Sequence, residues 1–205
     1  DLAAPASLAG LVERVAPDLV VNPAARPGAL NPALPTIFIA GDSTAARGKG
    51  EMQQGWGVPF AAYFDPAKVN VANHARGGRS SRTFVSEGRW ERLIAEVKAG
   101  DFVLIQFGHN DAKLEDPTRY TDPDSDYPQL LMRYVQVARD KGATPVLVTP
   151  VARLLYDFGS LLDTHARYTL AMQQLAAREH VALIDLNDRS MRWIRALGEQ
   201  GARPY

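Results

Sequence analysis

The sequence has no cysteine, no long apolar run and no net charge. Without cysteine, the 205-residue chain can form no disulfide, no thiolate metal site and no cysteine nucleophile. No apolar run approaches the roughly 20 residues that a membrane span needs, so we expect no membrane partner. Lys+Arg and Asp+Glu number 23 each, so the overall charge gives no reason to expect a nucleic-acid partner. The length and the 46% apolar content are those of one globular domain with a proper core.

The first 35 residues differ in composition from the rest. They are rich in Ala and Pro, and the closely spaced prolines after Val15 exclude a long helix there. We expect a short helix over residues 7–15 and then an extended segment. Residues 1–35 are therefore predicted to be an N-terminal arm or linker, and residues 36–205 the main domain. Because the chain starts at Asp1 without a leader, we expect that a signal peptide has been removed or the chain trimmed.

Strands and helices alternate after Pro35. Short apolar runs predict buried strands over residues 36–40, 68–73, 102–107, 145–149 and 181–186. Apolar stripes at helical spacing lie between them, and two of these end at Gly100 and Gly142. A further helix is expected after Thr164 as N-cap, and another through Met191 and Ile194. This alternation predicts an α/β fold: a three-layer α/β/α sandwich with a five-stranded parallel sheet in the flavodoxin-like order 2-1-3-4-5.

Three short polar stretches follow the first three predicted strands. Ser43 stands after the first strand in Gly-Asp-Ser, Gly78 follows the second in a Gly-Gly pair, and Asn110 follows the third. In the predicted strand order these loops meet at one edge of the sheet. A serine hydroxyl can act there as a nucleophile, while a glycine N–H and an asparagine amide stabilise an oxyanion. Taken singly, each stretch is equally typical of a turn or a helix cap.

These stretches resemble conserved blocks of a known family. Residues 41–44 (Gly-Asp-Ser-Thr), 78–84 (Gly-Arg-Ser-Ser-Arg-Thr-Phe), 87–90 (Glu-Gly-Arg-Trp) and 106–111 (Gln-Phe-Gly-His-Asn-Asp) are similar to the GDSL/SGNH hydrolases, most of all to their rhamnogalacturonan acetylesterase branch. The likeness continues through residues 148–151 and 163–165. It implies a secreted or periplasmic serine esterase that removes acetyl groups from carbohydrate. It also implies Ser43 as nucleophile, with the Ser43 N–H, the Gly78 N–H and the Asn110 amide as oxyanion hole.

The resemblance breaks at the catalytic base. The family takes its base from an Asp-x-x-His block after the last strand, and this sequence has no such block. His165, in Asp163-Thr164-His165, mimics the block and is kept as a substitute base, although its place before the last strand favours a structural role. Three explanations stay open: the Asp and His come from a missing C-terminal segment or a second chain, the protein is inactive but binds carbohydrate, or His165 serves in an altered geometry.

Other residues suggest how a substrate is held. Arg76, Arg79 and Arg82 crowd the second loop and could pair with carboxylates of an acidic sugar polymer, or internally with Glu87 and Glu91. Trp56 could stack on a sugar ring or pack against a helix. No set of carboxylates and histidines has metal-ligand spacing, so we expect neither metal nor cofactor. The expected substrate is a carbohydrate ester, of the pectin or rhamnogalacturonan type. The alternative is a catalytically incomplete carbohydrate-binding relative of these esterases.

Overall fold

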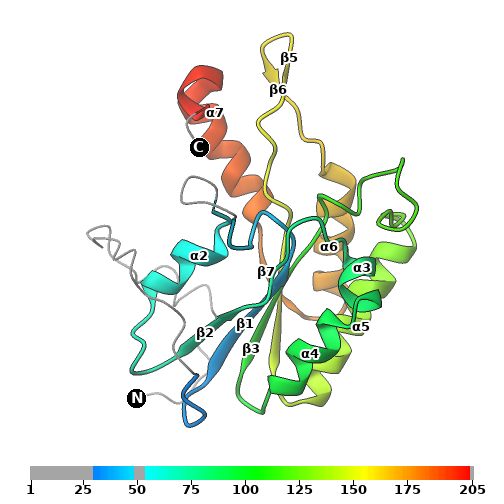
Figure 1. Cartoon of the computed structure of the whole chain (residues 1–205). Helices are drawn as coiled ribbons and strands as arrows, with labels where there is room; N and C mark the ends of the chain where they lie inside the picture. Colours follow the sequence, from blue (N-terminus) through cyan, green and yellow to red (C-terminus); the bar gives the residue numbers. More distant parts are fainter. Residues whose placement is uncertain (1–29, 49–53, 204–205) are drawn as a thin grey trace.

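A five-stranded parallel sheet forms the centre of the molecule (Figure 1). The computed structural model describes residues 30–48 and 54–203. The strands run in the order β2-β1-β3-β4-β7. Their bounds are β1 Thr36–Gly41, β2 Asn70–Asn73, β3 Phe102–Gln106, β4 Thr144–Val148 and β7 Ala182–Ile184. Since every neighbouring pair is parallel, all five carboxyl ends lie at one edge. The predicted strand order is confirmed.

Helices cover both faces of this sheet. Helices α3 (Ser81–Ser86), α4 (Arg89–Glu96), α5 (Asp126–Asp140) and α6 (Ala166–Arg178) lie on one side in Figure 1. The other side carries α2 (Gly57–Phe60), which continues into the 3-10 turn η1 (Ala61–Tyr63), and α7 (Leu186–Ala202). The structure therefore has the three layers that the alternating sequence pattern predicts. Within the described residues, no helix is both long enough and apolar enough to cross a membrane.

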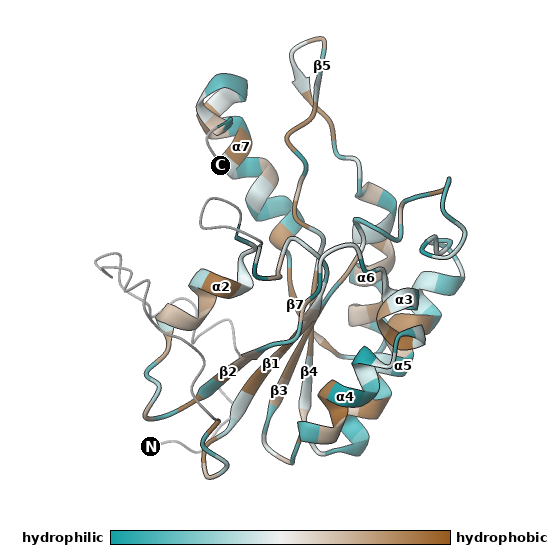
Figure 2. Ribbon diagram, viewed as in Figure 1, coloured by the Kyte–Doolittle hydropathy of each residue, from teal (hydrophilic) through white to brown (hydrophobic). Residues whose placement is uncertain are grey.

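The apolar side chains of β1 alternate between two cores. Phe38 packs with the α4–α6 layer, whereas Ile37 and Ile39 pack with residues of the α2 and α7 layer. All three are at most 2% exposed. A strand buried on both faces must be apolar throughout, which explains its uninterrupted apolar run. Figure 2 shows the hydrophobic residues concentrated on the strands and on the inner sides of the helices.

Some element boundaries differ from those predicted. Strand β2 begins at Asn70 instead of residue 68, and β7 covers only Ala182–Ile184. The N-cap of α6 is His165 and not Thr164, because the side chain of Asp163 accepts the His165 N–H and holds the chain in a turn up to that residue. The hairpin formed by β5 (Tyr156–Asp157) and β6 (Ser160–Leu161) is not predicted by the sequence pattern. The helix predicted over residues 7–15 lies outside the described residues.

Candidate active site

Ser43 lies just beyond the end of β1, and its side chain is exposed. The serine hydroxyl makes no hydrogen bond to any described residue. The residue before it, Asp42, is fully buried and accepts the N–H of Thr44 at 2.8 Å. This Asx-type turn fixes the backbone on both sides of Ser43. A serine in such a turn at the carboxyl edge of a parallel sheet is placed to meet a ligand.

The loop after β2 lies directly against Ser43. The Arg76 N–H donates to the carbonyl of Gly41 at 2.9 Å, which joins this loop to the end of β1. A Cβ built on Gly77 would lie 3.7 Å from the Cβ of Ser43. Gly78 has a φ of +81°, in the left-handed region that favours glycine. The paired glycines thus bring bare backbone next to the serine, as the sequence predicts.

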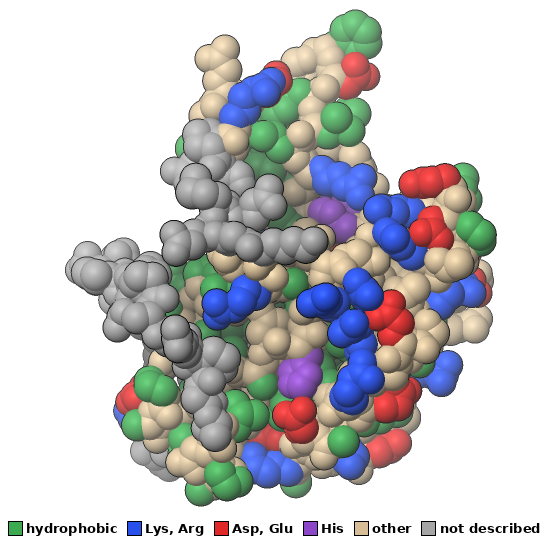
Figure 3. Space-filling model, viewed as in Figure 1, with side chains coloured by type: hydrophobic (Ala, Val, Ile, Leu, Met, Phe, Trp, Pro, Cys, Tyr) green, Lys and Arg blue, Asp and Glu red, His purple; other side chains and the backbone are tan. Residues whose placement is uncertain are grey.

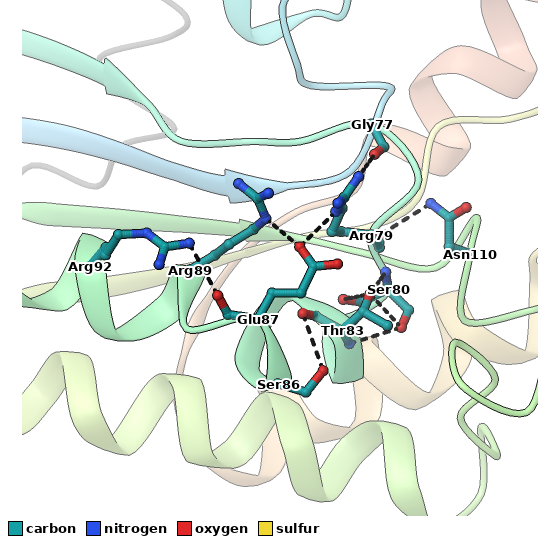
Figure 4. Close-up of polar contacts among 9 residues, drawn as sticks. All are labelled: Gly77, Arg79, Ser80, Thr83, Ser86, Glu87, Arg89, Arg92 and Asn110. Carbon is teal, nitrogen blue, oxygen red and sulfur yellow. Dashed lines mark hydrogen bonds and ion pairs between the residues drawn. The ribbon is translucent and has the colours of Figure 1, made fainter.

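Asn110 joins the same place from the loop after β3. Its side chain is 4% exposed, and its Nδ2 donates to the carbonyl of Arg79 at 3.1 Å, as Figure 4 shows. The second N–H of this amide makes no hydrogen bond to a described residue. The structure therefore gathers Ser43, the glycine loop and Asn110 at one edge of the sheet. These are the three groups that acyl transfer needs for attack and for charge stabilisation.

A cluster of buried and part-buried polar side chains lies at the end of β1. The Thr44 hydroxyl lies 2.8 Å from Oδ1 of Asp42 and 2.9 Å from Oε1 of Gln106. Burial raises the pKa of Asp42, and a nearby imidazole, His109, opposes that rise. The other carboxylate oxygen of Asp42 and the Nε2 of Gln106 are buried and have no hydrogen-bond partner among the described residues. Sequence reasoning missed this cluster, although Gly-Asp-Ser-Thr and the strand ending in Gln106 supply its members.

The two histidines nearest this cluster form a stacked pair. The rings of His109 and His165 lie 4.2 Å apart at an angle of 26°. His165 is 1% exposed; its Nδ1 contacts the Thr164 hydroxyl at 3.0 Å, and its Nε2 has no partner in the described part of the chain. Burial, followed by the influence of His109 and Arg153, lowers the pKa of His165 to about 3. No hydrogen bond joins Ser43 to either ring, so neither is placed as its base.

The other two histidines also lack contact with Ser43. His74 approaches Glu96, with 3.8 Å between Nε2 and Oε2, and burial lowers its pKa. His180 is exposed at the end of the segment that leads into β7. Among the described histidines, none makes the serine–imidazole hydrogen bond of a catalytic triad.

Two of the three arginines that could bind substrate, Arg79 and Arg82, are paired within the protein. Arg79 donates to Glu87 at 3.0 Å and to the carbonyl of Gly77 at 2.8 Å (Figure 4). Arg82 pairs with Asp126 at 2.6 Å, and not with Glu91. Arg76 is exposed and makes no ion pair with any described residue. Figure 3 shows Lys and Arg side chains gathered with acidic ones on the face in view. Of the three arginines, Arg76 is therefore the one with its charge available.

Trp56 is held by the protein as well. Its ring meets Phe60 edge-on with centroids 5.6 Å apart, and its indole N–H donates to Oε1 of Gln106 at 3.3 Å. The side chain is only half-buried, so part of the ring faces outward. Trp56 thus packs against a residue of helix α2, which is one of the two roles that the sequence allows for it. In residues 30–48 and 54–203, no three His, Asp or Glu side chains form a group that could hold a metal.

Comparison with known families agrees with this geometry. Residues 39–203 match the model of the GDSL-like lipase/acylhydrolase family. The chain belongs to this family. The match begins inside β1 and runs through α7, so it includes all three loops of the site. The resemblance drawn from the sequence motifs is confirmed.

Named relatives in the GDSL-like family include carbohydrate acetylesterases. Over 170 residues, the chain is 43% identical to a probable rhamnogalacturonan acetylesterase, YesY, of Bacillus subtilis; the match covers 82% of this chain and 78% of that protein. It is 39% identical to the rhamnogalacturonan acetylesterase RhgT of the same organism, covering 82% and 71%.

Solved structures show the same fold. The crystal structure of YxiM from Bacillus subtilis superposes with a TM-score of 0.74 at 27% identity, covering 83% of this chain. This chain spans about half of that protein, since 48% of it is covered. Axe2, an acetylxylan esterase from Geobacillus stearothermophilus, superposes with a TM-score of 0.64 at 19% identity, covering 81% and 82% of the two chains.

Proposed function

We propose that this chain is a serine esterase that removes acetyl groups from carbohydrate, of the pectin or rhamnogalacturonan type. The observation that carries the proposal is the exposed Ser43 at the end of β1, with the Gly77–Gly78 backbone against it and the Asn110 amide beside that loop. Relatives at 43% and 39% identity bear the name rhamnogalacturonan acetylesterase.

In this proposal the reaction has two steps. The Ser43 oxygen attacks the acetyl carbonyl, and its proton passes to a base. The negative charge that develops on the carbonyl oxygen is stabilised by the N–H groups of Ser43 and Gly78 and by the free N–H of Asn110. Collapse of this adduct breaks the bond to the sugar oxygen, which takes the proton back from the base and leaves as a hydroxyl, while the acetyl group stays on Ser43. Water then hydrolyses the acetyl-enzyme and frees acetate.

The base is the part of this mechanism that the described histidines do not supply. His165 is buried, and its low pKa makes it a weak proton acceptor at neutral pH. We therefore propose that the proton of Ser43 is taken by a group outside the described residues, supplied by a C-terminal segment or by a second chain. Added imidazole tests this idea, because a small base can enter an exposed site and replace a missing one.

Acetate release from acetylated pectin and from an aryl acetate tests the function. We expect release by the wild-type protein, stimulated by imidazole, and a loss of at least about 100-fold in Ser43→Ala. Each imidazole concentration is also run with Ser43→Ala, because imidazole itself cleaves aryl acetates. Equal rates for the two proteins, both above a blank without protein, would show that Ser43 is not the nucleophile.

One observation favours a second function. Since no described histidine contacts Ser43, the chain could be a carbohydrate-binding relative without catalysis. Sugar binding by a protein that neither releases acetate nor reacts with a serine-directed phosphonate, with imidazole present, would select this alternative.

A further inference from the structure

His109, the neighbour of the proposed oxyanion residue, makes three contacts with the segment that follows β4. The Nε2 of His109 lies 2.7 Å from the carbonyl oxygen of Val151. The guanidinium of Arg153 donates to the backbone carbonyl of His109 at 3.1 Å. The third contact is the ring stack with His165, at 4.2 Å. All three partners follow β4 in the chain, whereas His109 follows β3. The stack therefore ties the β3 loop to the segment between β4 and α6.

The residues on either side of His109 have little freedom. Gly108 has a φ of +147°, and a Cβ there would lie 2.4 Å from Cγ of Pro150. Asn110 is buried and bonded to the Arg79 carbonyl on the side of the glycine loop. The short segment 108–110 is thus held from the β4 side by Pro150 and the histidine stack. From the β2 side it is held by the Asn110 amide hydrogen bond and, at the next residue, by the carboxylate of Asp111, which accepts from the N–H and the hydroxyl of Ser81.

The hydrogen bonds show how each imidazole contributes. A carbonyl oxygen only accepts, so Nε2 of His109 carries the proton that it donates to Val151. His165 is different, because its buried Nε2 has no partner within residues 30–48 and 54–203. Among these residues, the polar contact of its ring is the one between Nδ1 and the adjacent Thr164. His165 therefore acts on His109 through the flat face of its ring. Burial lowers the pKa of both rings and so favours their neutral forms, which do not repel each other across the stack.

We propose that His165 is a positioning residue: its ring, stacked on His109, fixes the segment 108–110 and so holds the Asn110 amide at the oxyanion position. This inference rests on the proposed function of Asn110. It means that a residue at the N-cap of α6 affects the rate of the acetyl-transfer step, although it lies outside the loops that follow β1, β2 and β3. A shift of an oxyanion donor by about 1 Å costs on the order of 100-fold in rate, so a loosened stack is expected to cost less.

Kinetics of two substitutions at one position test this role. In His165→Ala the stacking face is lost, and we expect kcat for an aryl acetate to fall about 10-fold with KM within about two-fold. His165→Phe keeps a flat ring and is expected to restore kcat to within about three-fold of wild type. His180→Asn is the control, because His180 is exposed and its φ of +51° suits asparagine. Should His165→Ala fail to fold, His165→Leu fills the space without a flat ring and takes its place.

A measurement that needs no turnover separates this inference from the proposed function. The side-chain amide of Asn110 gives its own pair of proton–nitrogen NMR signals in labelled protein. We expect these signals to shift and broaden in His165→Ala, and to stay near their wild-type positions in His165→Phe and His180→Asn. Unchanged Asn110 signals and unchanged kcat in folded His165→Ala would overturn the inference. Altered signals in a protein without esterase activity would support it and refute the proposed function alone.

Discussion

The burial of His165 makes the stability of the protein depend on pH. The native ring has a pKa of about 3, against an ordinary value of 6.5, mainly because burial disfavours its charged form. Below pH 6.5 the unfolded chain therefore takes up a proton that the native protein does not. The free energy of unfolding therefore falls as the pH is lowered from 6.5 towards 3. Above pH 6.5 the ring is neutral in both states, and this loss of stability is absent.

His165→Phe removes this part of the pH dependence. Between pH 6.5 and pH 5, one such histidine lowers the free energy of unfolding by about 1.5 kcal/mol. We expect the wild-type protein to lose about that much more stability than His165→Phe over this range. Urea unfolding at closely spaced pH values measures the difference. Parallel curves for the two proteins would mean that His165 is not kept neutral by the fold.

Gly108 is a second residue whose role is set by its surroundings. Alanine at this position meets both a φ of +147° and a Cβ contact of 2.4 Å with Pro150. We expect Gly108→Ala to lower the free energy of unfolding by about 3 kcal/mol or more. Gly159→Ala is the matched control, since Gly159 also has a positive φ, +77°, but nothing within 4 Å of its Cβ position. It is expected to cost about 1 kcal/mol in the same urea experiment.

At the scale of elements, a buried carboxylate joins the amino ends of β1 and β3. Asp101 is 0% exposed; its Oδ1 accepts the Thr36 N–H at 2.8 Å and its Oδ2 accepts the Lys98 N–H at 2.9 Å. The Lys98 ammonium balances the charge, with Nζ 2.8 Å from Oδ1. Two strands that are far apart in sequence thus start in register.

Asp101→Ala leaves the buried Thr36 N–H and the part-buried Lys98 N–H without their acceptors. We expect the free energy of unfolding to fall by about 3 kcal/mol, because each unsatisfied buried donor costs about 1–3 kcal/mol. Asp140→Ala, at the exposed end of α5, is the control and is expected to change stability by less than about 0.5 kcal/mol. Similar stability of the two variants in urea would contradict the role assigned to Asp101.

Among the elements, the buried strands could be predicted from the sequence, whereas the short hairpin could not. Buried strands such as β1 and β3 are continuous apolar runs, so their positions and order followed from pattern and from the rules of parallel sheets. The β5–β6 hairpin has two residues per strand, which is too short for any periodicity. The start of α6 was misplaced by one residue because the Asp163 turn depends on a side-chain contact and not on composition.

The residues of the site likewise fall into those that the sequence could predict and those that it could not. Ser43, Gly78 and Asn110 were predicted to meet because each directly follows a strand, and strand order alone brings their loops to one edge. The stack of His109 on His165 was not predicted, since those residues are brought together by the packing of the β4–α6 segment against the β3 loop. The internal pairing of Arg79 and Arg82 was left open, because local sequence does not decide between a partner in the protein and one in the substrate.

At the scale of the whole molecule, attraction for an acidic polymer has to be local. Lys+Arg and Asp+Glu are equal at 23 each, so no net charge draws a polyanion to the surface. In the loop and helix that follow β2, Arg82 is paired with Asp126, and Arg79 shares Glu87 with Arg89. Arg76 keeps its charge beside the glycine loop. We therefore expect Arg76 to carry much of any preference for uronate-bearing chains.

Arg76→Gln tests this expectation through binding, with Ser43→Ala present in every protein to prevent turnover. We expect the Kd for oligogalacturonate, measured by calorimetry, to rise about 2- to 5-fold, because one exposed charge pair contributes up to about 1 kcal/mol. Salt should weaken binding to the Arg76-containing protein more than to the variant, since screening acts on the charge that Arg76 supplies. Arg133→Gln, at an exposed position on α5, removes the same charge and is expected to leave Kd unchanged. Equal effects of the two substitutions would mean that the polymer responds to overall charge and not to an arginine beside Ser43.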